Sequence, residues 1–109
     1  MRVLITGGAG YIGTELCLKL MENPDVEAIH VYDNLSRKNY NFFLGPEKLN
    51  DKVSFVDADL LDSHTLGKEI SDMDVVVHLA AVVTTPFADQ QPHLFDQVNN
   101  WGTAELCYA

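Results

Sequence analysis

Three glycines spaced by two residues, Gly7, Gly10 and Gly13, connect an apolar run to a helical pattern near the start of the chain. Residues 1–6 stop at the first glycine as a buried parallel strand would, and residues 11–21 repeat their apolar side chains at helical spacing. A chain that reverses so tightly after a strand needs Gly7 where a side chain would clash or where φ is positive. The pattern therefore predicts a strand that turns directly into a helix.

The start of such a helix favours negative charge. Gly10 would let the backbone approach a pyrophosphate, and Gly13 would let the helix pack closely on the sheet. The free N–H groups of the first turn, together with the helix dipole, favour an anion by ~0.3–1 kcal/mol or more. The other interpretation is a glycine-rich strand-to-helix turn without a ligand, and the glycines alone do not decide between the two.

The rest of the chain alternates short apolar runs with helical patterns, without an internal domain boundary. Further strands are expected at residues 28–32, 53–56 and 75–80, and further helices at residues 36–44, 63–70 and 92–108. Gly45 is expected to follow the helix at 36–44 as its left-handed C′ residue, with Pro46 just beyond. The apolar residues expected to face the sheet from the helices are Ile12, Leu16, Leu20, Leu66 and Ile70. This order predicts an α/β fold, a parallel sheet of about four strands with helices on both faces.

The charge balance excludes some classes of partner. Sixteen acidic and seven basic side chains give a net charge of −9, a field that repels nucleic-acid backbones and anionic lipid surfaces. Fixed backbone dipoles at a helix start can still hold one anion. No apolar stretch approaches the ~20 residues of a membrane span, and no signal-peptide pattern is present. The histidines and cysteines lack metal-ligand spacing, so we expect no metal site and a soluble, cytoplasmic chain.

A carboxylate, Asp33, ends the second expected strand twenty residues after Gly13. This is the spacing at which a carboxylate accepts hydrogen bonds from the adenosine ribose of a bound dinucleotide. The alternative is a turn or cap residue, since Asp-Asn is common at strand ends. Together the glycines and Asp33 favour dinucleotide binding, and Asp33 would repel a 2′-phosphate, so NAD is favoured over NADP. Arg37 could contact a phosphate, so the preference is not absolute.

The motifs TGGAGYIG, VYDNLSR, DADLLD, HLAA and NNWGT follow one another in this order. With them, essentially the whole chain resembles the extended short-chain dehydrogenase/reductase family. More narrowly, it is similar to the N-terminal part of NAD-dependent nucleotide-sugar epimerases and dehydratases, the UDP-glucose 4-epimerase-like branch. The resemblance implies a Rossmann-type doubly wound parallel sheet, NAD as the cofactor and a nucleotide sugar as the substrate of the full-length enzyme.

The resemblance also implies roles for residues near the glycine turn and the second strand. It assigns Tyr11 and Ile12 to the turn that meets the pyrophosphate. It places Asp33, Asn34 and Ser36 along the adenosine ribose.

Past the third strand, Asp59 and Leu60 resemble the pair that meets the adenine, with Asp59 accepting from its exocyclic amine. The alternative is a purely structural role, in which Asp59 only caps the following turn. Leu79, Ala80 and Ala81 match the turn that passes under the cofactor, although the alanines could be small merely because a helix passes over them.

Two further positions complete the implied site. Val83 falls where the family often has a larger contact residue, and Asn99 matches the Asn of a helix motif near the cofactor ribose. Trp101 departs from that motif, in which a small apolar residue is usual. Asn99 could instead be a buried polar residue that hydrogen-bonds the helix to the sheet. His78 is more readily explained as a buried imidazole with satisfied hydrogen bonds than as an acid or base.

The catalytic residues of this family are not in the chain. The family's chemistry uses a Ser/Thr and a YxxxK pair after the fifth strand, and none of the four tyrosines here has Lys four residues later. The chain ends in an apolar helical pattern without a glycine cap. We therefore expect one truncated dinucleotide-binding portion, residues 1–109, that cannot catalyse alone. The alternatives are a stand-alone non-catalytic module and an NADP-dependent reductase. A homodimer of the full-length enzyme would be built from later helices.

Overall fold

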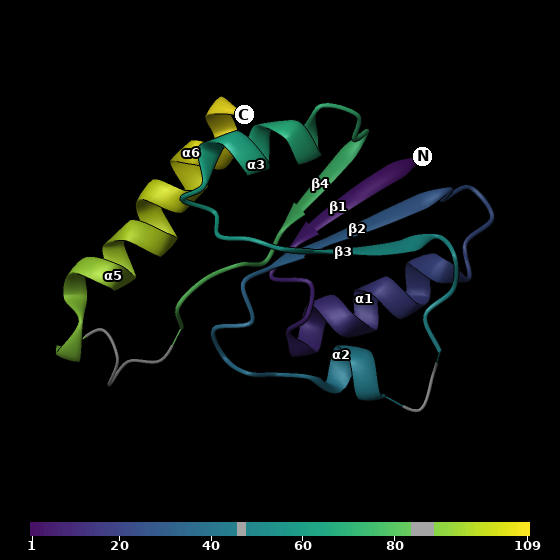
Figure 1. The fold of residues 1–109 in the computed structure, drawn as a ribbon, viewed down its shortest axis with the longest axis horizontal. Helices are drawn as coiled ribbons and strands as arrows, with labels where there is room; N and C mark the ends of the chain where they lie inside the picture. Colours follow the sequence, from purple (N-terminus) through teal and green to yellow (C-terminus); the bar gives the residue numbers. More distant parts are fainter. Residues whose placement is uncertain (46–47, 84–88) are drawn as a thin grey trace.

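Four parallel strands form the centre of the structure, in the order β3-β2-β1-β4 (Figure 1). The computed structural model describes residues 1–45, 48–83 and 89–109. Its strands are β1 (Arg2–Thr6), β2 (Ala28–Asp33), β3 (Val53–Asp57) and β4 (Val75–His78). β1 lies between β2 and β4, and it pairs with β2 from Arg2 opposite Ala28 onward. The predicted parallel sheet of four strands is confirmed.

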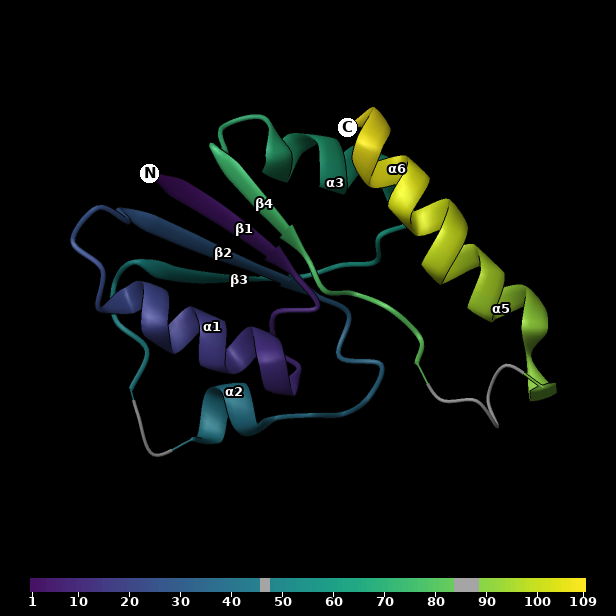
Figure 2. The ribbon, with the colours of Figure 1, turned by 180° about the vertical axis from the view of Figure 1, so that it is seen from behind.

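Helices cover both faces of the sheet (Figures 1 and 2). α1 (Tyr11–Met21) and α2 (Asn41–Leu44) lie on one face, and α3 (Ser63–Ile70) and α6 (Gly102–Tyr108) lie on the other. Each face has its own apolar cluster, because alternate strand residues point to opposite sides. Within the described residues, no helix is long and apolar enough to cross a membrane. The doubly wound arrangement predicted from the element order is confirmed.

The buried face of α1 differs from the prediction at its first turn. Gly13 and Cys17, four residues apart, are buried, and Leu16 and Leu20 pack partly against the same cluster. Ile12 is 72% exposed, so its expected position on the buried face is wrong. Gly13 lies directly against the glycine turn, which fixes the inward face of the helix one residue away from Ile12.

The second helix is shorter than predicted. It begins at Asn41, because Leu35 and Lys38 have φ angles of 55° and 52°, in the left-handed region that a right-handed helix cannot contain. Gly45 is extended, with φ −62°, so the left-handed C′ role expected for it is wrong. Pro46 lies outside the described residues.

The last predicted helix is present over its whole length but contains a wide turn. α5 (Pro92–Asp96) leads into a π-helical turn, η1 (Gln97–Trp101), and then into α6. The amide of Gly102 donates to the carbonyl of Gln97, five residues earlier, which defines the wide turn. Gly102 is buried against Leu60 from the loop after β3. Because π-helical turns of this kind are frequent at functional sites, the side chains of η1 are candidates for a functional site.

Candidate cofactor-binding site

The sheet has a topological switch point between β1 and β4. The chain passes from β1 to β2 and β3 on one side and then returns to pair with β1 from the other side. The loops that follow β1 and β4 leave the sheet at the same edge (Figure 1). In open α/β sheets, ligands bind outside the carboxyl ends of the strands at such a point.

The loop after β1 is a glycine turn that leaves no room for side chains. Gly7 has φ +67°, and a Cβ placed on it would lie 2.6 Å from the backbone nitrogen of Ala80. Both reasons predicted for a glycine there are confirmed. A Cβ on Gly13 would lie 2.5 Å from Cα of Gly8, so this glycine packs on the turn itself rather than on a strand. Gly8, which the spacing rule did not single out, is buried under Val31, and its Cβ would lie 2.7 Å from that side chain.

The N-terminus of α1 has the features of an anion site. Gly10 is its N-cap, no side chain caps it among the described residues, and no acidic residue lies in its first turn. The hydrogen bonds of the described residues leave the amides of Tyr11, Ile12 and Gly13 without an acceptor. The side chains of Tyr11 and Ile12 are both exposed. These uncapped amides and the helix dipole can hold a phosphate group.

Asp33 connects the end of β2 to this glycine turn. Its Oδ2 accepts from the amide of Ala9 at 3.1 Å, and its Oδ1 accepts from the amide of Leu35 at 2.8 Å. The second contact is the turn contact that the alternative interpretation predicted. It does not exclude a ribose contact, since two carboxylate oxygens offer about four acceptor positions. The structure thus places the carboxylate beside the glycine turn, and its contact with a ribose stays a prediction.

Asn34 and Asp59, from the ends of two neighbouring strands, lie together. Nδ2 of Asn34 donates to Oδ2 of Asp59 at 3.2 Å, while Oδ1 of Asp59 accepts from the amide of Leu61. Ser36 is exposed, and its amide donates to Oδ1 of Asn34. Leu60 is only 6% exposed and belongs to the apolar cluster on the α3 side, so its side chain is not available to a ligand.

The loop after β4 is held by the hydroxyl of Thr6, the last residue of β1. Its Oγ1 accepts from the amides of Leu79 and Ala80 at 3.2 and 3.3 Å. This loop starts at Leu79, so the strand predicted to reach Ala80 ends two residues earlier. Ala81 and Val83 are exposed at the same edge.

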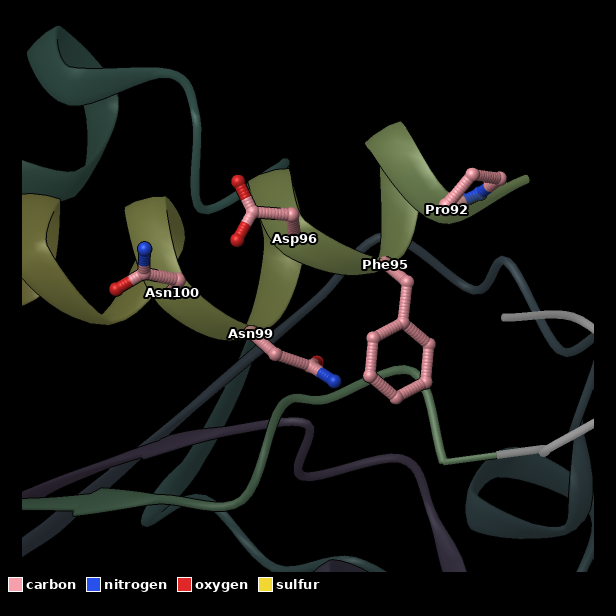
Figure 3. A pocket seen from close by; sticks show the side chains of 5 residues that line it. All are labelled: Pro92, Phe95, Asp96, Asn99 and Asn100. Atoms are coloured by element: carbon pink, nitrogen blue, oxygen red, sulfur yellow. The ribbon is translucent and has the colours of Figure 1, made fainter. Parts of the chain in front are cut away.

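Asn99 lies on η1 and binds the loop after β4. Its Oδ1 accepts from the amide of Val82 at 2.7 Å, and its Nδ2 donates to the carbonyl of Val82 at 2.8 Å. The alternative interpretation of Asn99 expected a buried polar contact between helix and sheet; the structure instead shows a half-buried side chain that binds the loop after β4. Together with Phe95 and three neighbours, Asn99 lines an open hollow of about 400 Å³ (Figure 3). Asp96 and Asn100 point away from the side on which Asn99 and Phe95 extend.

His78 joins the end of β4 to the same helix. Thr6 Oγ1 donates to His78 Nδ1 at 2.6 Å, and His78 Nε2 lies 3.0 Å from Thr103 Oγ1, which in turn donates to the carbonyl of Asn99. These partners assign a neutral ring with its proton on Nε2. Burial lowers the pKa of His78, which agrees with the neutral form. The interpretation of His78 as an imidazole with both ring nitrogens satisfied is confirmed, although the residue is half-buried rather than fully buried.

His78 makes the stability of the folded protein depend on pH. Because its folded pKa lies below the unfolded value, the unfolded state binds more protons as the pH falls below ~6.5, and stability falls with it. The slope should not exceed ~1.4 kcal/mol per pH unit. Urea unfolding between about pH 7 and pH 5 should show less pH dependence in His78→Gln than in the parent. The exposed control His93→Gln should keep the parent slope, and equal slopes in all three proteins would contradict the assignment.

The chain matches the NAD dependent epimerase/dehydratase family over residues 3–109. A putative UDP-glucose 4-epimerase of Methanocaldococcus jannaschii is 34% identical over 105 residues, which are 95% of this chain and 32% of that protein. A dTDP-glucose 4,6-dehydratase of Mycolicibacterium smegmatis is 33% identical over 100 residues, 90% of this chain and 30% of that protein. The chain therefore spans about a third of the length of these relatives.

Solved structures agree with the sequence relatives. The dTDP-glucose 4,6-dehydratase DesIV of Streptomyces venezuelae, solved with NAD and TYD bound, matches with a TM-score of 0.85 and 31% identity over 99% of this chain and 35% of that one. A UDP-glucose 4-epimerase of Thermus thermophilus in complex with NAD matches with a TM-score of 0.76 and 29% identity, covering 99% of this chain and 33% of that one.

The fold and the glycine turn define a Rossmann-type α/β protein with its topological switch point between β1 and β4. Within that class, the chain belongs to the NAD dependent epimerase/dehydratase family. The family resemblance predicted from the motifs is confirmed.

Proposed function

We propose that this chain binds the adenosine and pyrophosphate half of NAD at the carboxyl edge of its sheet. The observation that carries the proposal is the hydrogen bond from the amide of Ala9 to Oδ2 of Asp33. It brings a carboxylate suited to ribose hydroxyls next to a helix N-terminus suited to phosphate. Membership of an NAD dependent family, with similar proteins solved with NAD bound, supports the proposal.

The residues present fit this cofactor. Gly7, Gly8 and Gly13 are required by the packing of the turn itself, since a Cβ on any of them would lie within 2.7 Å of a neighbouring atom. Gly10 is different: its backbone is extended, and an added Cβ would meet only the carbonyl of Gly7, at 3.2 Å. Packing within the protein therefore gives the weakest reason for a glycine at position 10. Close approach of a pyrophosphate to the backbone gives a direct reason.

The family resemblance supplies the roles that we propose for the other residues around this edge. Asp33, Asn34 and Ser36 would line the ribose, and the carboxylate of Asp59 would accept from the adenine amine. The loop from Leu79 to Val83, which Thr6 and Asn99 hold, would pass under the cofactor.

In the full protein, we propose an epimerase or dehydratase acting on a nucleotide sugar. NAD, when bound, supplies the hydride acceptor, and this chain binds and orients it. UDP-glucose and dTDP-glucose, which the names of the relatives give as substrates, are the compounds to try. That residues 1–109 alone lack turnover stays a prediction.

Calorimetric titration of the protein that carries this sequence, with NAD and with NADP, tests the proposal. We expect NAD to bind at least about tenfold more tightly, because a 2′-phosphate beside the carboxylate of Asp33 places like charges together. Equal affinities, or tighter binding of NADP, would contradict the ribose role of Asp33. Binding of neither would contradict the proposal as a whole.

A further inference from the structure

Tyr32 places a buried hydroxyl beneath the loop after β3. The residue precedes Asp33 in β2, so its side chain lies on the opposite face of the sheet, and it is only 1% exposed. Its ring packs with Leu4 and Leu66 in the cluster on the α3 side. A buried tyrosine hydroxyl needs a partner, and this one donates to the backbone carbonyl of Asp59 at 2.7 Å.

Four hydrogen bonds hold Asp59. Its carbonyl accepts from the hydroxyl of Tyr32 and from the amide of Asp62, its Oδ2 accepts from Nδ2 of Asn34, and its Oδ1 accepts from the amide of Leu61. The contacts with Asn34 and Leu61 lie in exposed surroundings, whereas the contact with Tyr32 reaches Asp59 from inside the core. Of the two donors to the carbonyl of Asp59, the hydroxyl of Tyr32 is therefore the one that comes from a buried side chain.

The phenol of Tyr32 remains a donor over the physiological pH range. Burial and the negative charges of Asp62, Asp59 and Glu69 raise its pKa to about 12. A phenol that stays protonated beside a carbonyl oxygen keeps its hydrogen bond at neutral pH.

We infer that Tyr32 is a positioning residue that, through its hydroxyl and the main chain of Asp59, makes the site select a purine with an amino group over one with an oxo group. The inference rests on the proposed function, in which the carboxylate of Asp59 accepts from the adenine amine. Hypoxanthine presents a carbonyl oxygen at that position and cannot donate to the carboxylate. Selection between the two bases therefore depends on where the carboxylate lies.

Two dinucleotides that differ only at this group test the inference: NAD and nicotinamide hypoxanthine dinucleotide. Calorimetry on the full protein that carries this sequence should show the parent binding NAD about tenfold more tightly. Tyr32→Phe keeps the ring and removes the hydroxyl. We expect the ratio of the two dissociation constants to fall to about threefold or less, mainly through weaker binding of NAD.

A purely structural role for Tyr32 would give a different result. It would weaken both dinucleotides by the same factor and leave the ratio unchanged, which would overturn the inference, as would a variant with unchanged constants. Tyr40→Phe, at a half-exposed tyrosine, is the matched control and should keep the parent ratio. In a background of Asp59→Ala, Tyr32→Phe should not change the ratio further, because the side chain it positions is gone.

A second variant covers the case in which Tyr32→Phe does not fold. p-Aminophenylalanine placed at position 32 keeps a donor in the same place and should retain the preference for NAD, so loss of the preference would contradict the inference. A parent protein that binds neither dinucleotide would contradict the proposed function itself. A parent that binds both equally would overturn only the role of Tyr32 and Asp59 and leave cofactor binding standing.

Discussion

Replacing Gly7 with alanine is expected to lower the free energy of unfolding by about 2–4 kcal/mol and to weaken NAD binding at least tenfold. The residue has φ +67°, and the new methyl group would lie 2.6 Å from the backbone nitrogen of Ala80. Backbone atoms cannot rotate away as a side chain can, so the turn and the loop after β4 must separate. Urea unfolding and calorimetry measure the two effects.

Gly67→Ala is the matched control for this change. Gly67 lies inside α3, and an added Cβ would meet no atom within 4 Å. Alanine there should raise stability by about 0.5–1 kcal/mol, through helix propensity alone, and leave NAD binding unchanged. If both variants changed stability in the same direction and by similar amounts, the close contact described for Gly7 would be wrong.

Asp33→Ala is expected to raise the dissociation constant for NAD at least tenfold, or ~1.4 kcal/mol. It removes the acceptor proposed for the ribose hydroxyls and also releases the amide of Ala9. It removes the charge that disfavours a 2′-phosphate as well, so the preference for NAD over NADP should shrink. The second effect separates a ribose contact from mere loosening of the turn, since loosening would weaken both cofactors alike.

Asp57→Ala supplies the control for charge. Asp57 ends β3, pairs in register with Asp33 and is exposed, so its loss removes one negative charge from the neighbouring strand end. We expect its NAD and NADP constants to match those of the parent. An unchanged NAD constant in Asp33→Ala would remove the main argument for the ribose contact.

Much of the fold could be predicted because it depends on local periodicity. The apolar runs placed all four strands to within one or two residues, and the helices α1 and α3 begin and end where their patterns do. The helical conformation predicted for residues 36–40 is wrong because the left-handed backbone at Leu35 and Lys38 has no distinct signature in those residue types. The wide turn η1 was missed; Gly102 at its end packs against Leu60, a contact between distant parts of the chain that local periodicity does not report.

In the candidate site, too, local features could be predicted and contacts between distant residues could not. The spacing of Gly7, Gly10, Gly13 and Asp33 was informative, because tight turning and strand length fix it locally. The contacts of Tyr32 with Asp59 and of His78 with Thr6 were not predicted, because they depend on which strands lie side by side. Only the sheet order β3-β2-β1-β4 brings those residues together.

A crystal structure of the protein that carries this sequence, grown with NAD, would locate the cofactor directly. We expect the ribose hydroxyls of the adenosine half within about 2.5–3.2 Å of the Asp33 carboxylate, and the pyrophosphate at the amides that begin α1. NAD bound at another edge of the sheet, or adenosine at this edge without a contact to Asp33, would contradict this expectation.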